Sequence, residues 1–358
     1  MSVDEGIEGY GQVDTLDHAR LIEEIFAPRL IGVDPSNIED CSRRCLPEFK
    51  TQKNIDDQTI LRAFGGLEMA LWDIKAKAFN VPLCELLGGR VRKEILFTEY
   101  FALRPASKND PGTPTPKDVA KYCARMREEF GSTIFEGKMG VLDLNTEIKM
   151  VKEIRAAIGE DATLRLDANM AWPINRAREA LKKLEPYNIA NLEDPTENFY
   201  DMAKLRLHTA IPFSSHGPVD LRTIANLGVP DSLVLNVANL GGIRETLKCI
   251  SACEHMGIGF WFYSGDSAVG TAAYMQLGAA VPYLEQPNQS LFRWYEDDII
   301  EEMFSPRNNR VTLPDGPGLG IRIDRKALKR CRQRFEKQGP LESLSKESAI
   351  HFSRLRLQ

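Results

Sequence analysis

The sequence predicts an α/β protein in which a parallel sheet closes into a barrel. From about residue 93 onward, short apolar runs alternate with amphipathic stretches of roughly 12–16 residues. The apolar runs are continuous rather than alternating, which indicates strands buried on both faces of a parallel sheet. About seven strand–helix units follow one another, and that number favours closure into a (β/α) barrel. An open, doubly wound sheet is the alternative, because periodicity alone does not show that a sheet closes.

The chain before residue 93 is expected to be helical. Residues 16–26 and 56–87 both carry apolar side chains at helical spacing. In the second segment these side chains recur every three or four residues, at Leu67, Ala70, Leu71, Ile74 and Ala78. Pro82 and the pair Gly88–Gly89 then interrupt the pattern. We therefore separate residues 1–92 from the barrel.

Seven apolar runs are expected to form the strands, at residues 95–101, 133–138, 163–167, 190–193, 211–215, 233–236 and 258–263. The main helices between them are expected at residues 117–129, 144–158, 175–184, 243–255 and 267–280. After about residue 314 the chain becomes strongly charged, and residues 338–358 are expected to be poorly packed and flexible.

Length and composition exclude several classes of protein. With 358 residues, the chain is long enough for two domains, or for one barrel of about 250 residues with an additional piece. A formal net charge of −5 offers no basic surface for nucleic acid. No apolar run reaches the ~18 residues of a membrane-spanning helix, and residues 1–11 do not resemble a signal peptide. We expect a cytoplasmic location, no nucleic-acid or membrane partner, and seven reduced cysteines, because their spacing suits neither zinc nor redox pairs.

Polar residues stand where the predicted strands end. In a parallel barrel, the chemistry gathers at the carboxyl ends of the strands. The residues at these ends are Glu136, Lys138, Asp167, Asn169, Glu193, Asp194, Ser214, Ser215, His216, Asn236 and Tyr263. Asp167 and Glu193 lie 26 positions apart, which is one whole strand–helix unit. Both carboxylates are therefore expected to point into the same barrel mouth.

Two carboxylates in one barrel mouth are ligands that a hard divalent cation such as Mg²⁺ prefers. The alternative for Asp167 and Glu193 is a capping role at the start of the following helices. Lys138 ends the strand before Asp167. A nearby cation and burial would lower the pKa of this lysine, which suits a general base. The alternative role for Lys138 is a surface salt bridge.

Six motifs occur along the chain in a fixed order: ALWDIKAKAFNVPLCELLGG, FEGKMG, RLDANMAW, NLEDPT, GGI and LPDGPGLGI. Together they resemble the mandelate racemase group of the enolase superfamily, most closely its glucarate dehydratase-like acid-sugar dehydratases, over about residues 7–325. The resemblance implies a (β/α)7β TIM-type barrel at residues 93–312. It also implies an α+β capping domain built from both chain ends, residues 1–92 and 313–358. The implied chemistry is Mg²⁺-dependent abstraction of the proton α to a carboxylate, through an enediolate.

Carried over residue by residue, the resemblance makes Lys138 the general base and Asp167 and Glu193 the first two metal ligands. His216, 23 positions after Glu193, stands at the third ligand position, where the glucarate branch has Asn. An imidazole there would shift the metal preference from Mg²⁺ toward Mn²⁺, Fe²⁺ or Zn²⁺. Glu136 replaces a lysine that accompanies the base in that branch, so the charge at this position is reversed.

The second acid/base pair of the family, a histidine oriented by an aspartate, is replaced by Tyr263 and Asn236. We expect Tyr263 to act as a weak acid toward the leaving hydroxide, the alternative being a wall residue. Asn236 is expected either to contact substrate or to make a structural hydrogen bond. Asn169, Glu136 and Glu285 complete the expected substrate contacts.

The chain begins near the third strand of the family's capping domain, so we expect the first cap strands and the substrate lid to be missing. The leading functional prediction is a metal-dependent hydro-lyase that dehydrates an aldonate or aldarate, and a homo-oligomer is expected. A one-base isomerase or cycloisomerase is an alternative within the same chemistry. The other alternative is a non-catalytic barrel that binds a sugar acid or a partner.

Overall fold

The protein is described from a computed structural model, in residues 1–4, 6–46, 57–106, 111–216, 219–263, 267–289, 291–295 and 297–339. The chain divides into two compact units. The first unit comprises Met1–Ile95, Leu235–Ser305 and Val311–Lys329, and the second comprises Leu96–Val234, Pro306–Arg310 and Arg330–Gln358. The expected domain limits at residues 92 and 312 stay a prediction. Most of the tail expected to be flexible, residues 340–358, lies outside the described residues.

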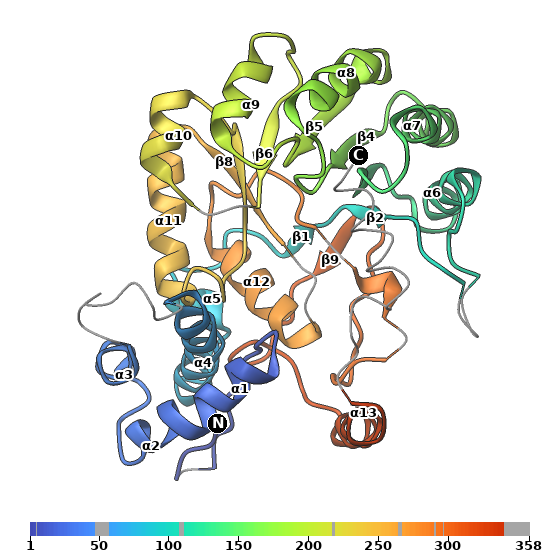
Figure 1. Cartoon of the computed structure of the whole chain (residues 1–358). Coiled ribbons are helices and arrows are strands. Elements are labelled where there is room, and N and C mark those ends of the chain that lie inside the picture. The colour runs from blue at the N-terminus through green and yellow to red at the C-terminus, as the bar shows by residue number, and fades with distance from the viewer. Residues whose placement is uncertain are drawn as a thin grey trace. The chain divides into compact units, whose positions relative to one another are not determined.

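A curled parallel sheet of seven strands organises the fold, with strand order β2-β3-β4-β5-β6-β7-β8 (Figure 1). Its strands are β2 (Glu99–Phe101), β3 (Ile134–Lys138), β4 (Thr163–Asp167), β5 (Ile189–Glu193), β6 (Phe213–Ser215), β7 (Ser232–Leu235) and β8 (Gly259–Phe262). The strands follow chain order because a helical crossover joins each parallel neighbour to the next. Together with the family evidence given below, this sheet confirms the predicted α/β fold of TIM type. A separate two-stranded sheet contains β1 (Glu94–Leu96) and β9 (Arg310–Thr312), so the run predicted at 95–101 forms two short strands.

The described residues also form helices. They are α1 (Leu16–Leu21), the π-helix η1 (Ile22–Phe26), α2 (Ala27–Leu30), α3 (Ile38–Cys45), α4 (Asp57–Ala78), α5 (Leu83–Leu86), α6 (Pro116–Phe130), α7 (Leu144–Ile158), α8 (Ile174–Leu184), the 3-10 turn η2 (Glu185–Tyr187), α9 (Phe199–Arg206), α10 (Leu221–Leu227), α11 (Ile243–Met256), α12 (Ala268–Ala280), the 3-10 turn η3 (Phe292–Trp294) and α13 (Arg325–Gln338). In the part of the chain described, none of them is both long and apolar enough to span a membrane. All seven cysteines lie within the described residues, where none of them forms a disulfide bond.

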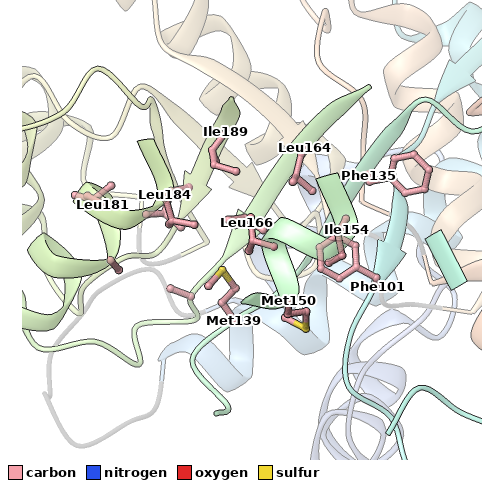
Figure 2. Packing of buried hydrophobic residues seen from close by; sticks show 14 of the residues in the cluster. Phe101, Phe135, Met139, Met150, Ile154, Leu164, Leu166, Leu181, Leu184 and Ile189 are labelled. Atoms are coloured by element: carbon pink, nitrogen blue, oxygen red, sulfur yellow. The ribbon is translucent and has the colours of Figure 1, made fainter. Parts of the chain in front are cut away.

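Side chains in the second unit alternate between two faces of the sheet. On one face, residues such as Phe135, Leu164, Leu166 and Phe213 are fully buried. They pack against helices α6, α7, α8 and α9 in one apolar cluster, part of which Figure 2 shows. Burying each such side chain stabilises the fold by about 1.5–3 kcal/mol. The opposite face carries the polar residues Glu136, Lys138, Arg165, Asp167, Asn191, Glu193 and Ser214, because successive strand residues point to opposite sides.

Local capping explains where the helices of the second unit begin and end. The Thr115 hydroxyl accepts the Asp118 N–H at the start of α6, and the Asp143 carboxylate does the same for Thr146 at the start of α7. Helix α6 ends at Gly131, whose φ of 69° lies in the left-handed region that glycine adopts without strain. Strands β3 and β4 finish level with each other, since their last residues, Lys138 and Asp167, are register partners.

The first unit packs helix α4 against the amino-terminal helices and against α11. Phe26 and Phe64 meet edge to face, with ring centroids 6.2 Å apart. Glu68 of α4 caps helix α11, because its carboxylate accepts the N–H of Ile243 at 2.6 Å and the N–H of Arg244 at 3.1 Å. The preceding Gly242 has a φ of 115°, and a Cβ there would lie 2.4 Å from the Glu68 carboxylate. The GGI motif therefore serves this close approach of α4 to the start of α11.

Candidate active site

Three predicted site residues end neighbouring strands of the second unit at the same level. Lys138 pairs in register with Asp167, and Asp167 pairs in register with Glu193. Ser214 of β6 is the next residue in that row. Because all four side chains lie on the polar face of the sheet, the strand order brings an ammonium group and two carboxyl groups to one edge.

The Asp167 carboxylate is the centre of a hydrogen-bond cluster. Its Oδ2 accepts from Lys138 Nζ at 2.5 Å and from the Tyr100 hydroxyl at 3.1 Å. Its Oδ1 accepts the backbone N–H of Asn169 at 2.8 Å. Lys138 Nζ also donates to Asn169 Oδ1 at 2.7 Å. The Lys138 ammonium is thus held between two oxygen atoms of the motif RLDAN, which fixes its position beside the barrel mouth.

Glu193 and Asp194 are buried carboxyl groups next to this cluster. Burial raises the pKa of Glu193 well above its usual value, and the charges of Asp167, Glu136 and Asp194 raise it further, while Lys138 lowers it. Burial likewise raises the pKa of Asp194 to about 6, against hydrogen bonds from Ser215 and His216 that lower it. Negative charge is therefore in excess at this edge of the sheet.

His216 follows strand β6, two residues after Ser214, and is half-buried. Its backbone N–H donates to Asp194 Oδ2 at 3.2 Å. The neighbouring Ser215 hydroxyl donates to Asp194 Oδ1 at 2.7 Å. Asp194 thereby connects the end of β5 to the end of β6.

Glu136 lies deeper on the polar face, where it is fully buried. Its carboxylate forms an ion pair with the guanidinium of Arg165, which is 2% exposed. The two residues are partners in the β3–β4 register. The charge that is reversed at position 136 is therefore matched by Arg165 on the next strand, and a contact between Glu136 and substrate stays a prediction.

The remaining predicted site residues, Asn236, Tyr263 and Glu285, belong to the first unit. Asn236 is buried, and its Oδ1 accepts the N–H of Asn239 at 3.0 Å in the turn after β7. Tyr263 follows β8 and is half-buried, with its backbone N–H donating to the carbonyl of Leu235 at 2.9 Å. Glu285 is exposed. The catalytic and substrate-binding roles of these three residues stay predictions.

The donor set at the strand ends fits a divalent cation. Asp167 and Glu193 supply hard oxygen atoms side by side, and the raised pKa of Glu193 shows that added positive charge would stabilise its carboxylate. Within the described ranges, no group of three His, Cys, Asp or Glu side chains is placed to hold a metal ion. His216 as the third ligand therefore stays a prediction.

Sequence reasoning did not single out a site role for Tyr100, Arg165, Asp194 or Ser215. Tyr100 lies inside the first predicted strand, and Arg165 precedes Asp167 by two residues. The alternation of side chains along a strand could have identified both as members of the polar face. Asp194 and Ser215 stood among the strand-end residues, but their mutual hydrogen bond depends on backbone geometry that no sequence pattern reveals.

The chain matches two family models and several known proteins. Residues 1–88 match the mandelate racemase/muconate lactonizing enzyme N-terminal domain, and residues 118–327 match the enolase C-terminal domain-like family. A chloromuconate cycloisomerase from Pseudomonas putida is 28% identical over 314 residues, which cover 85% of this chain and 80% of that protein. A Streptomyces coelicolor protein named "Probable glucarate dehydratase" is 28% identical over 286 residues, which cover 76% of this chain and 66% of that protein.

Solved structures share the fold. A crystal structure of an isomerase from Streptomyces coelicolor A3(2) superposes with a TM-score of 0.79 at 29% identity, covering 91% of this chain and 90% of that one. Together, the two family matches span most of the chain, and they include every predicted site residue. The chain belongs to the mandelate racemase/muconate lactonizing enzyme group of the enolase superfamily.

Proposed function

We propose that the protein is a metal-dependent enzyme that removes the proton α to a carboxylate and eliminates water from an acid sugar. The observation that carries this proposal is the row of Lys138, Asp167 and Glu193 at three neighbouring strand ends. The row supports the proposal because an amine beside two carboxylates could act as a base next to a metal ion, as proton abstraction next to a carboxylate requires.

In this mechanism, the neutral amine form of Lys138 accepts the α-proton at Nζ and becomes an ammonium group. Asp167 and Asn169 hold Nζ in place, since both accept hydrogen bonds from it. Tyr100 donates to the same Asp167 oxygen and so fixes the carboxylate that orients the lysine. A divalent cation on Asp167 and Glu193, Mg²⁺ or Mn²⁺, would supply positive charge that stabilises the negative charge developing on the substrate carboxylate.

Elimination of water completes the proposed reaction. The electron pair of the broken C–H bond forms the C=C bond, and the bond between the β-carbon and its hydroxyl group breaks. The departing hydroxide needs one proton, and we assign this step to the phenol of Tyr263. The substrate is proposed to be an aldonate or aldarate, a class supported by the similarity to the glucarate dehydratase-named relative.

A one-base cycloisomerase or isomerase is the second candidate. Two observations favour it: the chloromuconate cycloisomerase relative, and the replacement of the family's histidine–aspartate pair by Tyr263 and Asn236. This reaction needs Lys138 and the metal, but no second base. Dependence on Tyr263 therefore separates the two candidates.

The test is exchange of the α-proton in D₂O, measured by NMR with Mg²⁺ or Mn²⁺ and a panel of aldonates, aldarates and muconates. Exchange that Lys138→Ala lowers by about 10²–10⁴-fold supports the proposal. Lys183→Ala is the matched control, because Lys183 lies in the same unit and bonds Asn145 Oδ1 at 2.7 Å. If the metal-loaded protein exchanges no substrate of the panel, the alternative of a non-catalytic barrel replaces the proposal.

A further inference from the structure

Asp194 stands directly after the proposed metal ligand Glu193, yet its carboxylate is engaged by strand β6. Ser215 donates its hydroxyl to Asp194 Oδ1 at 2.7 Å, and the His216 N–H donates to Oδ2 at 3.2 Å. Both oxygens of this buried carboxylate are therefore used to hold the last residue of β6 and the residue that follows it.

The backbone of Asp194 is also held in an uncommon conformation. Its φ is 42°, in the left-handed region that residues other than glycine seldom adopt. Two backbone hydrogen bonds hold it there. Its N–H donates to the Ser214 carbonyl at 2.9 Å, and its carbonyl accepts the N–H of Met170 at 2.8 Å. Asp194 thus joins the ends of β4, β5 and β6 through its own main chain and side chain.

The alternation of the strands explains what this connection achieves. Glu193 and Ser214 are register partners on the polar face. His216 follows the end of β6, and continued alternation is what we expect to bring it to their side of the sheet. Ser215 lies on the opposite side, where its hydroxyl donates to the Asp194 carboxylate. The Asp194–Ser215 contact therefore holds β6 from the face opposite Glu193. It leaves the polar face to Glu193 and His216.

We infer that Asp194 and Ser215 are positioning residues for His216 as the third ligand of the divalent metal. This inference rests on the proposed function, because it takes Glu193 as a ligand, and it adds the predicted third ligand His216 to that site. Asp194 itself does not bind the metal; it sets the distance between the two strand ends that do. Partners of this kind, which orient a ligand without touching the metal, typically change metal affinity by about 10–100-fold when removed.

The test measures Mn²⁺ affinity of the purified full-length protein by electron paramagnetic resonance of free Mn²⁺. Asp194→Ala and Ser215→Ala are each expected to weaken binding by about 10–100-fold. Ser132→Ala is the matched control, since the buried Ser132 hydroxyl also donates to a buried carboxylate, Glu99 Oε2 at 3.0 Å, in the same unit. It should leave Mn²⁺ affinity unchanged.

A double-mutant cycle separates positioning from other roles. In a His216→Ala background, Asp194→Ala and Ser215→Ala should change Mn²⁺ affinity by less than about twofold. If either substitution weakens binding as strongly there as in the wild type, it does not act through His216 and the inference is wrong. The inference is also wrong if His216→Ala alone leaves Mn²⁺ affinity unchanged, although the proposed function then stands on Asp167 and Glu193. A wild-type protein that binds no Mn²⁺ overturns the proposed function and the inference together. If Asp194→Ala does not fold, Ser215→Ala decides the outcome.

Discussion

The ammonium nitrogen of Lys138 lies 2.5 Å from Oδ2 of Asp167, across two neighbouring parallel strands. The same carboxylate is the proposed first metal ligand. The proposed base and the proposed metal would therefore compete for one carboxylate, and this competition leads to the first prediction.

Replacing Lys138 by methionine is expected to strengthen Mn²⁺ binding while abolishing proton exchange. The ammonium group competes with a metal for the Asp167 carboxylate, and its side chain is 35% exposed, which limits the strength of that ion pair. We expect an increase in affinity of about twofold to fivefold, equivalent to an ion pair of up to about 1 kcal/mol. Titration with Mn²⁺ measures it. Unchanged or weaker binding would show that Lys138 does not compete for Asp167.

The stability of the first unit is expected to depend on pH through Glu68. Burial raises the pKa of this carboxyl from 4.5 to about 7, although the N–H groups of Arg244 and Ile243 and the indole of Trp72 lower it. A carboxyl with a raised pKa in the folded state binds its proton more tightly there than in the unfolded chain. Its contribution is therefore present below pH 4.5 and is lost as pH rises toward 7, by about 3 kcal/mol in all.

Urea unfolding at several pH values between 5 and 8 measures this loss. Glu68→Gln should flatten the profile, because the amide does not titrate. At pH 5 it should also be less stable than the wild type, because an amide NH₂ group would face an N–H of the α11 amino terminus. A variant with the same pH slope as the wild type would exclude Glu68 as the source.

The buried ion pair of Glu136 and Arg165 is expected to tolerate loss of both partners better than loss of one. Arg165→Met leaves a carboxylate buried without its guanidinium and should cost about 3–5 kcal/mol of unfolding free energy. The double substitution Glu136→Leu with Arg165→Met should recover most of this loss, because it removes both charges. Equal destabilisation in the single and double variants, measured by urea unfolding, would count against this account.

Two glycines at the ends of helix α11 are expected to differ in their tolerance of alanine. At Gly257, with a φ of 67°, a Cβ meets nothing within 4 Å, so alanine should cost only the left-handed strain of about 1–2 kcal/mol. At Gly242, the Cβ would clash with Glu68, and the loss should be at least about 2 kcal/mol greater. The midpoint of thermal unfolding compares them, and equal midpoints would refute the close approach at Gly242.

The sequence was sufficient to predict the long, strongly patterned elements. The expected strand at 163–167 coincides with β4, and the expected helix at 144–158 coincides with α7. Helices α9 and α10 were not predicted, because eight and seven residues are too few for a helical period to stand out. Short elements depend on capping and on their neighbours more than on their own pattern.

The candidate site was predictable as a set of residues and much less so as a set of contacts. Strand-end position and spacing pointed to Lys138, Asp167 and Glu193, because parallel strands end at one edge. The partner of Glu136 was not predicted, since it depends on which residue of β4 lies opposite in register. The link from Asp194 to Ser215 was missed for a related reason, because a single positive φ turns the aspartate toward the next strand.

The division of the sheet into a polar and an apolar face also constrains how this protein can diverge. Inserting one residue within β4 would exchange Asp167 with an apolar neighbour, exposing Leu166 on the polar side and forcing a carboxylate among Phe135 and Leu164. The insertion would therefore disrupt both the candidate site and the apolar packing. New activities are therefore accessible through substitutions that keep each side chain on its face of the sheet, such as those at positions 136 and 216. They are not accessible through changes in strand length.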